Sequence, residues 1–75
     1  MIKVTIGNNM KRESKFIDEE TTLRTALEEA EIDYTRGSIN LDGAPLGAGE
    51  LDKSFADFGI TEKCYLLQVV KTDNA

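Results

Sequence analysis

Two stretches decide the fold of this chain: residues 39–46, INLDGAPL, and residues 54–60, SFADFGI. The first begins with alternating apolar and polar residues, the period of a half-buried strand. Gly43 and Pro45 then force a turn, and Pro45 argues against a long central strand because proline donates no backbone hydrogen bond. The second stretch indicates a single helical turn that ends at Gly59. Together they predict a short strand, a tight turn and a helical connection.

Upstream, residues 2–6 alternate apolar and polar side chains and predict a half-buried strand. A Gly-Asn-Asn turn at 7–9 breaks the pattern, since glycine and asparagine tolerate the positive φ of tight hairpins. Residues 10–17 should return antiparallel to the first strand. Their alternation is weak, so the register stays open, with Phe16 or Ile17 anchoring the end.

One helix follows the acidic run at 18–20. Thr21 or Thr22 can cap it, and the acids lie near the positive end of the helix dipole. Its apolar residues fall at i, i+3, i+4 and i+7, a single stripe suited to one face of a sheet. The members of this stripe are Leu23, Ala26, Leu27 and Ala30.

Residues 64–71 form the strongest predicted strand. Apolar side chains occur at both parities of this segment, which favours a central strand. Leu46 can start a very short additional strand. We therefore expect one domain over residues 1–71 and a flexible polar tail over 72–75.

The order β-β-α-β-(short β)-turn-β predicts an α+β fold with one helix across a mixed sheet of four to five strands. The segments at 39–46 and 54–60, with the helix start at 22–23, resemble the ubiquitin-like superfamily, whose fold is the β-grasp. The resemblance covers residues 1–71. It implies a parallel pairing of the first and last strands, and a docking surface on the sheet face away from the helix.

Several relatives can be weighed against the residues present. Ubiquitin-like modifiers and sulfur carriers need a C-terminal Gly-Gly, whereas this sequence ends in VVKTDNA. Ferredoxins of the same fold need four cysteines, and this chain has one. The sequence thus resembles the bacterial non-conjugating members, and residues 58–61, FGIT, are similar to the small ubiquitin-like protein of the type VII secretion locus.

Composition excludes several function classes. The net charge of −5 disfavours nucleic-acid binding, and no apolar run approaches the ~18 residues of a membrane span. The chain lacks histidine, and no spacing of acids or glycines matches a calcium or phosphate loop. Cys64 fits a small residue at a strand start better than a nucleophile. We therefore expect no catalysis, metal or cofactor, and a cytoplasmic location.

The sheet face away from the helix is the predicted partner-binding surface. We expect Tyr65, Leu67 and Val69 to point inward, because burying the unpaired amide of Gln68 would cost about 1–3 kcal/mol. A register shifted by one residue would bury Leu66 instead. The predicted outward set comprises Lys3, Thr5, Asn40, Leu66, Gln68 and Val70, with Met10 flanking from the hairpin.

Three functions follow. We expect a non-enzymatic interaction module that binds another protein and is itself monomeric. The alternative is a sulfur-carrier or modifier relative without its Gly-Gly. A third class is a homo-oligomer formed through the edge of the sheet.

Overall fold

The computed structural model describes residues 1–8 and 10–70. The chain begins with a hairpin of β1 (Ile2–Gly7) and β2 (Arg12–Ile17), whose residues pair antiparallel from Ile2 opposite Ile17 to Gly7 opposite Arg12. At the turn, the side chain of Asn8 accepts hydrogen bonds from the amides of Met10 (2.8 Å) and Lys11 (2.9 Å). This side-chain cap explains why the hairpin reverses here.

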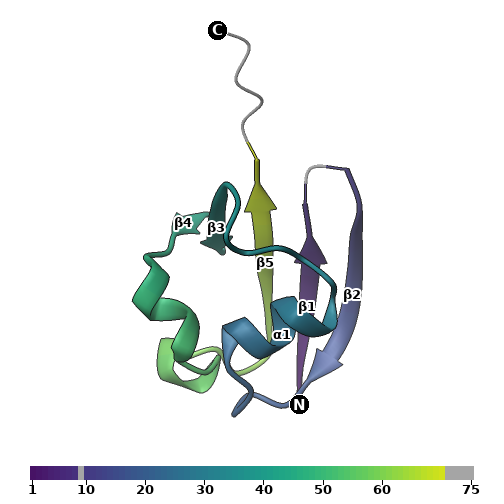
Figure 1. Ribbon diagram of the computed structural model, residues 1–75. Coiled ribbons are helices and arrows are strands. Elements are labelled where there is room, and N and C mark those ends of the chain that lie inside the picture. The colour runs from purple at the N-terminus through teal and green to yellow at the C-terminus, as the bar shows by residue number, and fades with distance from the viewer. Residues whose placement is uncertain (9, 71–75) are drawn as a thin grey trace, which may run out of the picture.

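Five strands form one mixed sheet in the order β2-β1-β5-β3-β4. The central strand β5 (Lys63–Val69) runs parallel to β1 and antiparallel to β3 (Ser38–Leu41), and β4 (Ala44–Pro45) closes the far edge. Figure 1 shows β1 and β5 side by side, with α1 across one face of the sheet. The expected β-grasp arrangement is confirmed, including the parallel central pair.

Helix α1 (Leu23–Glu29) begins at the predicted cap, where Thr22 accepts a hydrogen bond from the Thr25 amide at 3.2 Å. The predicted apolar stripe faces the sheet: Leu23, Ala26 and Leu27 are buried, and Ala30 packs at the margin of the core. Because the stripe is made of small and medium side chains, the helix can lie close to the strands.

Two short 3-10 helices connect β4 to β5. The first, η1 (Ala48–Asp52), lies where the glycines at 47 and 49 suggest a flexible stretch; the Glu50 carboxylate accepts from the Gly47 amide at 2.9 Å and fixes its start. The second, η2 (Ala56–Phe58), matches the predicted helical turn, and Gly59 ends it at a φ of 77°. The short strand β4 starts at Ala44 rather than at Leu46.

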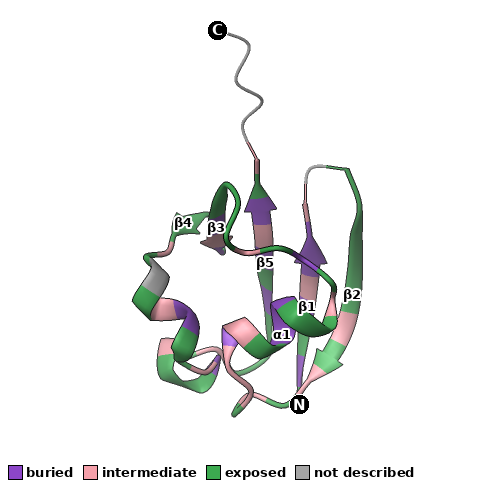
Figure 2. Cartoon of the chain, in the orientation of Figure 1, coloured by how far each residue is buried: buried purple, intermediate pink, exposed green. Residues whose placement is uncertain are grey.

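The core lies between the sheet and α1. Burial alternates along β1 and β5, as the purple and non-purple segments of Figure 2 show. Phe55 is the largest fully buried side chain and joins the η2 region to this core. Of the two candidate anchors of β2, Ile17 packs against the core and Phe16 is exposed. The predicted tail at 72–75 and the last residue of the predicted strand, 71, lie outside the described residues.

Within the described part of the chain, no helix is both long and apolar enough to span a membrane.

Candidate interaction surface

The face of the sheet away from α1, called the outer face below, is assembled by the strand register. Thr5 in β1 lies opposite Ser14 in β2 and Tyr65 in β5, so these three side chains share one face. The Thr5 and Ser14 hydroxyls lie 3.1 Å apart and form a hydrogen bond. The residues of the outer face include Arg12, Ser14, Phe16, Lys3, Thr5, Lys63, Tyr65, Leu67, Val69 and Asn40.

The predicted orientation of β5 is wrong. Leu66 is fully buried and Gln68 is 5% exposed, because their register partners Ile6 and Ile39 belong to the core. Conversely, Tyr65, Leu67 and Val69 point to the outer face, in place of Leu66 and Gln68. Val70 follows the end of β5, is half-buried, and has the parity of Leu66 along the chain. It therefore does not continue the outer face.

The error lies in the assumption that a buried Gln68 amide would be unpaired. Its Nε2 donates to the carbonyl of Asp33 at 2.5 Å and to that of Arg36 at 2.8 Å, both in the loop after α1. Two good acceptors offset the desolvation of the amide. Gln68 thereby connects this loop to the central strand. With Gln68 facing inward, the alternation of β5 places Tyr65, Leu67 and Val69 on the outer face.

The other predicted surface residues lie where the sequence placed them. Lys3 is exposed on the outer face, and Thr5 and Asn40 are half-buried there. Met10 is 92% exposed at the tip of the β1–β2 hairpin, outside the strands. Thr5 lies beside Tyr65 and Asn40 beside Leu67, two of the β5 residues that the sequence predicted to point inward.

Four apolar side chains on the outer face are exposed or half-buried. Phe16 is 72% exposed, Tyr65 51% and Val69 41%, and Leu67 lies half-buried between Tyr65 and Val69. Successive outward positions of one strand are about 7 Å apart, so the three β5 side chains form a continuous ridge. Contiguous apolar surface of this kind is typical of interaction sites.

The outer face also carries an unbalanced positive charge. Lys3 lies directly opposite Lys63 in the parallel register. Neither ammonium group has a carboxylate within 4.0 Å in the portion of the chain that the structure describes. Adjacent like charges on a sheet repel each other. An anionic group from outside would relieve that repulsion.

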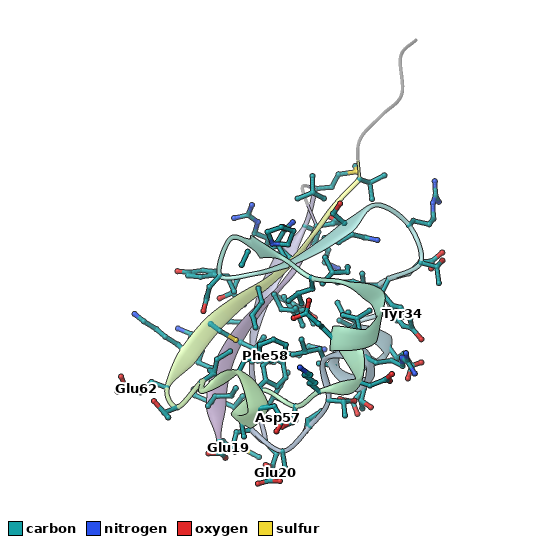
Figure 3. The ribbon with its side chains drawn as sticks, turned by 90° about the vertical axis from the view of Figure 1, so that its left-hand side faces the viewer. Glu19, Glu20, Tyr34, Asp57, Phe58 and Glu62 are labelled. Atoms are coloured by element: carbon teal, nitrogen blue, oxygen red, sulfur yellow. The ribbon has the colours of Figure 1, made fainter. Side chains whose placement is uncertain are left out.

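Acidic side chains gather elsewhere. Figure 3 shows Glu19, Glu20 and Asp57 together at the end of the molecule where β1 begins. On the helix side, Arg24 pairs with Asp52 at 2.7 Å and lies over the ring of Tyr34, 5.8 Å from its centroid. Acidic side chains thus gather at the end where β1 begins, whereas the outer face carries the adjacent cations Lys3 and Lys63.

The helix side also has a hollow of about 450 Å³, and Arg24 and Tyr34 are among the residues that line it. The Tyr34 hydroxyl donates to Glu28 at 3.0 Å, a contact that raises the pKa of the phenol. Arg24 pairs with Asp52 through one terminal nitrogen of its guanidinium, whereas its buried Nε has no hydrogen-bond partner among the described residues.

Cys64 lies on the buried parity of β5 and is 2% exposed. Desolvation, with a smaller contribution from the nearby Asp42 carboxylate, raises the pKa of its thiol to about 12. The thiol is therefore protonated at neutral pH and is a poor nucleophile. In the residues the structure describes, no three His, Cys, Asp or Glu side chains gather as a metal site.

The fold has clear structural counterparts. The chain is similar to the ubiquitin-like domain of the Arabidopsis thaliana protein At2g32350 in its solution NMR structure, with a TM-score of 0.72 and 20% identity over 99% of this chain and 81% of that one. A second structure of At2g32350, which combines sparse NMR data with evolutionary couplings, gives a TM-score of 0.62 and 22% identity over 97% and 89% of the two chains. No protein-family model and no curated protein matches the sequence. At this identity the likeness establishes the ubiquitin-like β-grasp fold.

Proposed function

We propose that this chain is a non-enzymatic interaction module, of the non-conjugating ubiquitin-like kind, that binds another protein through the outer face. The observation that carries the proposal is the exposed ridge of Tyr65, Leu67 and Val69 on the central strand. A central strand can keep apolar residues on both faces when its second face is covered by a partner. Aromatic and aliphatic anchors on such a surface supply most of the affinity of protein interfaces.

Charge defines the partner further. The unpaired cations Lys3 and Lys63 lie beside each other at the end of the ridge where β5 begins. Arg12 of β2 lies on the outer face as well. The partner surface should therefore combine apolar side chains with carboxylates that neutralise the two lysines. At physiological salt the screening length is about 8 Å, so these local cations act despite the net negative charge of the chain. A cytoplasmic setting fits the free thiol of Cys64.

The experiment is affinity capture with matched variants, each checked for folding by circular dichroism. The paired substitutions Tyr65→Ser and Val69→Ser remove two apolar anchors, and Lys3→Glu with Lys63→Glu reverses the two cations. Glu20→Lys with Glu29→Lys is the matched control, since it reverses two exposed charges away from the outer face.

We expect a protein captured by the wild type to be lost with the apolar variant, weakened with the lysine variant and retained with the control. Truncation of central anchors should lower affinity by roughly tenfold or more. Equal capture by all three variants, loss confined to the control, or no specifically retained protein would contradict the proposal.

A further inference from the structure

The strand β2 lies at one end of the sheet and bonds to β1 on one side only, as Figure 1 shows. Its bonding direction follows from two contacts: the Asn8 amide donates to the Lys11 carbonyl, and the Lys3 amide donates to the Glu62 carbonyl, both at 2.9 Å. Backbone groups alternate along a strand. Glu13 and Lys15 therefore bond to β1, and the N–H and C=O groups of the residues between and beside them face the free edge. These edge-facing residues are Arg12, Ser14 and Phe16.

This edge is self-complementary. When a second copy adds antiparallel about a two-fold axis, edge-facing residues must lie opposite edge-facing residues. An axis through Ser14 places Glu13 opposite Lys15 of the second copy, and Lys15 opposite its Glu13. An axis through Glu13 or through Lys15 would instead bring two like charges together. Among these three registers, only the one centred on Ser14 places Glu13 and Lys15 opposite each other, and it overlaps five of the six residues of β2.

The same register also brings complementary side chains together on the outer face of β2. Arg12 lies opposite Phe16 of the second copy, and Phe16 opposite its Arg12, so two guanidinium–aromatic contacts form symmetrically. Phe16 is the most exposed large apolar side chain of the described strands, at 72%. On the inner side, Glu13 and Lys15 already lie 3.3 Å apart within one chain. Two copies would therefore join four alternating charges.

We propose that β2 is a self-association edge, through which two copies form a continuous sheet centred on Ser14. Charged residues usually protect exposed sheet edges from pairing, but here their order favours one register. The sequence predicted a monomer and left a homo-oligomer through the sheet edge as a further class; the register of β2 now supplies the charge match for that edge. Because the contact involves a single short strand, we expect a weak dimer with a dissociation constant of roughly 0.1–1 mM. This inference does not depend on the outer face binding another protein.

Sedimentation velocity of the full chain from 10 µM to about 1 mM tests the inference, given the weak affinity expected of so short a contact. Four proteins are compared: the wild type, Glu13→Lys, Lys15→Glu and the double variant. Each single variant puts two like-charge pairs across the axis. The double variant exchanges the two charges, restores opposite pairs and keeps the net charge of −5.

We expect a concentration-dependent dimer for the wild type, dimerisation weaker by on the order of tenfold in each single variant, and recovery in the double variant. A wild type that stays monomeric to 1 mM, or four proteins that sediment alike, would overturn the inference. A dimer that is lost with Tyr65→Ser and Val69→Ser but unaffected by the charge variants would also overturn it, because association would then occur through the outer face.

Discussion

Replacing Gln68 by glutamate should destabilise the protein strongly at neutral pH and less in acid. The substitution keeps the shape of the side chain but turns the donor that faces the Asp33 and Arg36 carbonyls into a carboxylate. At 5% exposure, that carboxylate would be desolvated beside two oxygen atoms. A rise of about three units in the pKa of such a group costs about 3–4 kcal/mol of stability at pH 7. The whole domain has roughly 4–11 kcal/mol of stability.

The sign of the pH dependence follows from the raised pKa of the introduced carboxyl. Below the unfolded-state pKa of about 4.3 both states are protonated, so the penalty is smallest there. It grows as the pH rises toward the folded-state pKa, because only the unfolded chain releases the proton. Urea unfolding at pH 4 and pH 7 measures both values.

The matched control is Val69→Glu, one residue further along β5 on the exposed parity. It should cost less than about 1 kcal/mol, with little pH dependence. If Gln68→Glu were tolerated and Val69→Glu were strongly destabilising, the inward orientation of Gln68 would be refuted. The assignment of Tyr65, Leu67 and Val69 to the outer face would then be refuted too.

Two further predictions concern the core. Phe55→Ala should lower the free energy of unfolding by about 3–5 kcal/mol, because Phe55 is fully buried and the vacated space lies between η2 and the core; a loss below 1 kcal/mol in urea titration would contradict that placement. Because Cys64 keeps its proton in the folded state until about pH 12, stability should fall as the pH rises above about 8.5, where the unfolded chain ionises, by up to about 1.4 kcal/mol per pH unit. Cys64→Ala should remove this part of the alkaline slope, and identical slopes for the two proteins between pH 9 and 11 would count against a buried thiol.

The sequence predicted the elements that obey local rules. Leu23, Ala26 and Leu27 follow the helical period only, so the sequence predicts which face of α1 is buried. Gly59 ends a helical turn because it adopts a positive φ. The parallel pairing of β1 with β5 was implied by the resemblance to the ubiquitin-like superfamily, which local patterns brought out but did not replace.

The orientation of β5 could not be obtained in the same way. Apolar residues stand at both parities of this strand, so periodicity does not distinguish its faces. The deciding contacts join Gln68 to carbonyls 32 and 35 residues away, in a loop with no distinctive sequence signal. In the sequence alone the Gln68 amide has no visible partner, because both carbonyls are remote along the chain. One signal could have suggested the inward orientation of Gln68: a single glutamine within an otherwise apolar central strand, which implies a backbone partner in a nearby loop.

The register of β2 shows the same limit. Charged and polar residues occupy both of its faces, and Phe16 rather than a core residue is the prominent apolar side chain. Only the pairing with β1 shows that Phe16 shares a face with Lys3 and that Ile17 faces the core. Edge strands carry weak alternation because little of their surface is buried.

The most direct test of the proposed docking surface is an amide chemical-shift map of the ¹⁵N-labelled chain during titration with a protein captured by the wild type. Binding at the outer face should shift or broaden the amides of Lys3, Thr5, Tyr65 and Leu67 and leave the exposed helix residues Thr25, Glu28 and Glu29 unchanged. Perturbations that centre on those helix residues, with the β5 amides unmoved, would contradict the proposal.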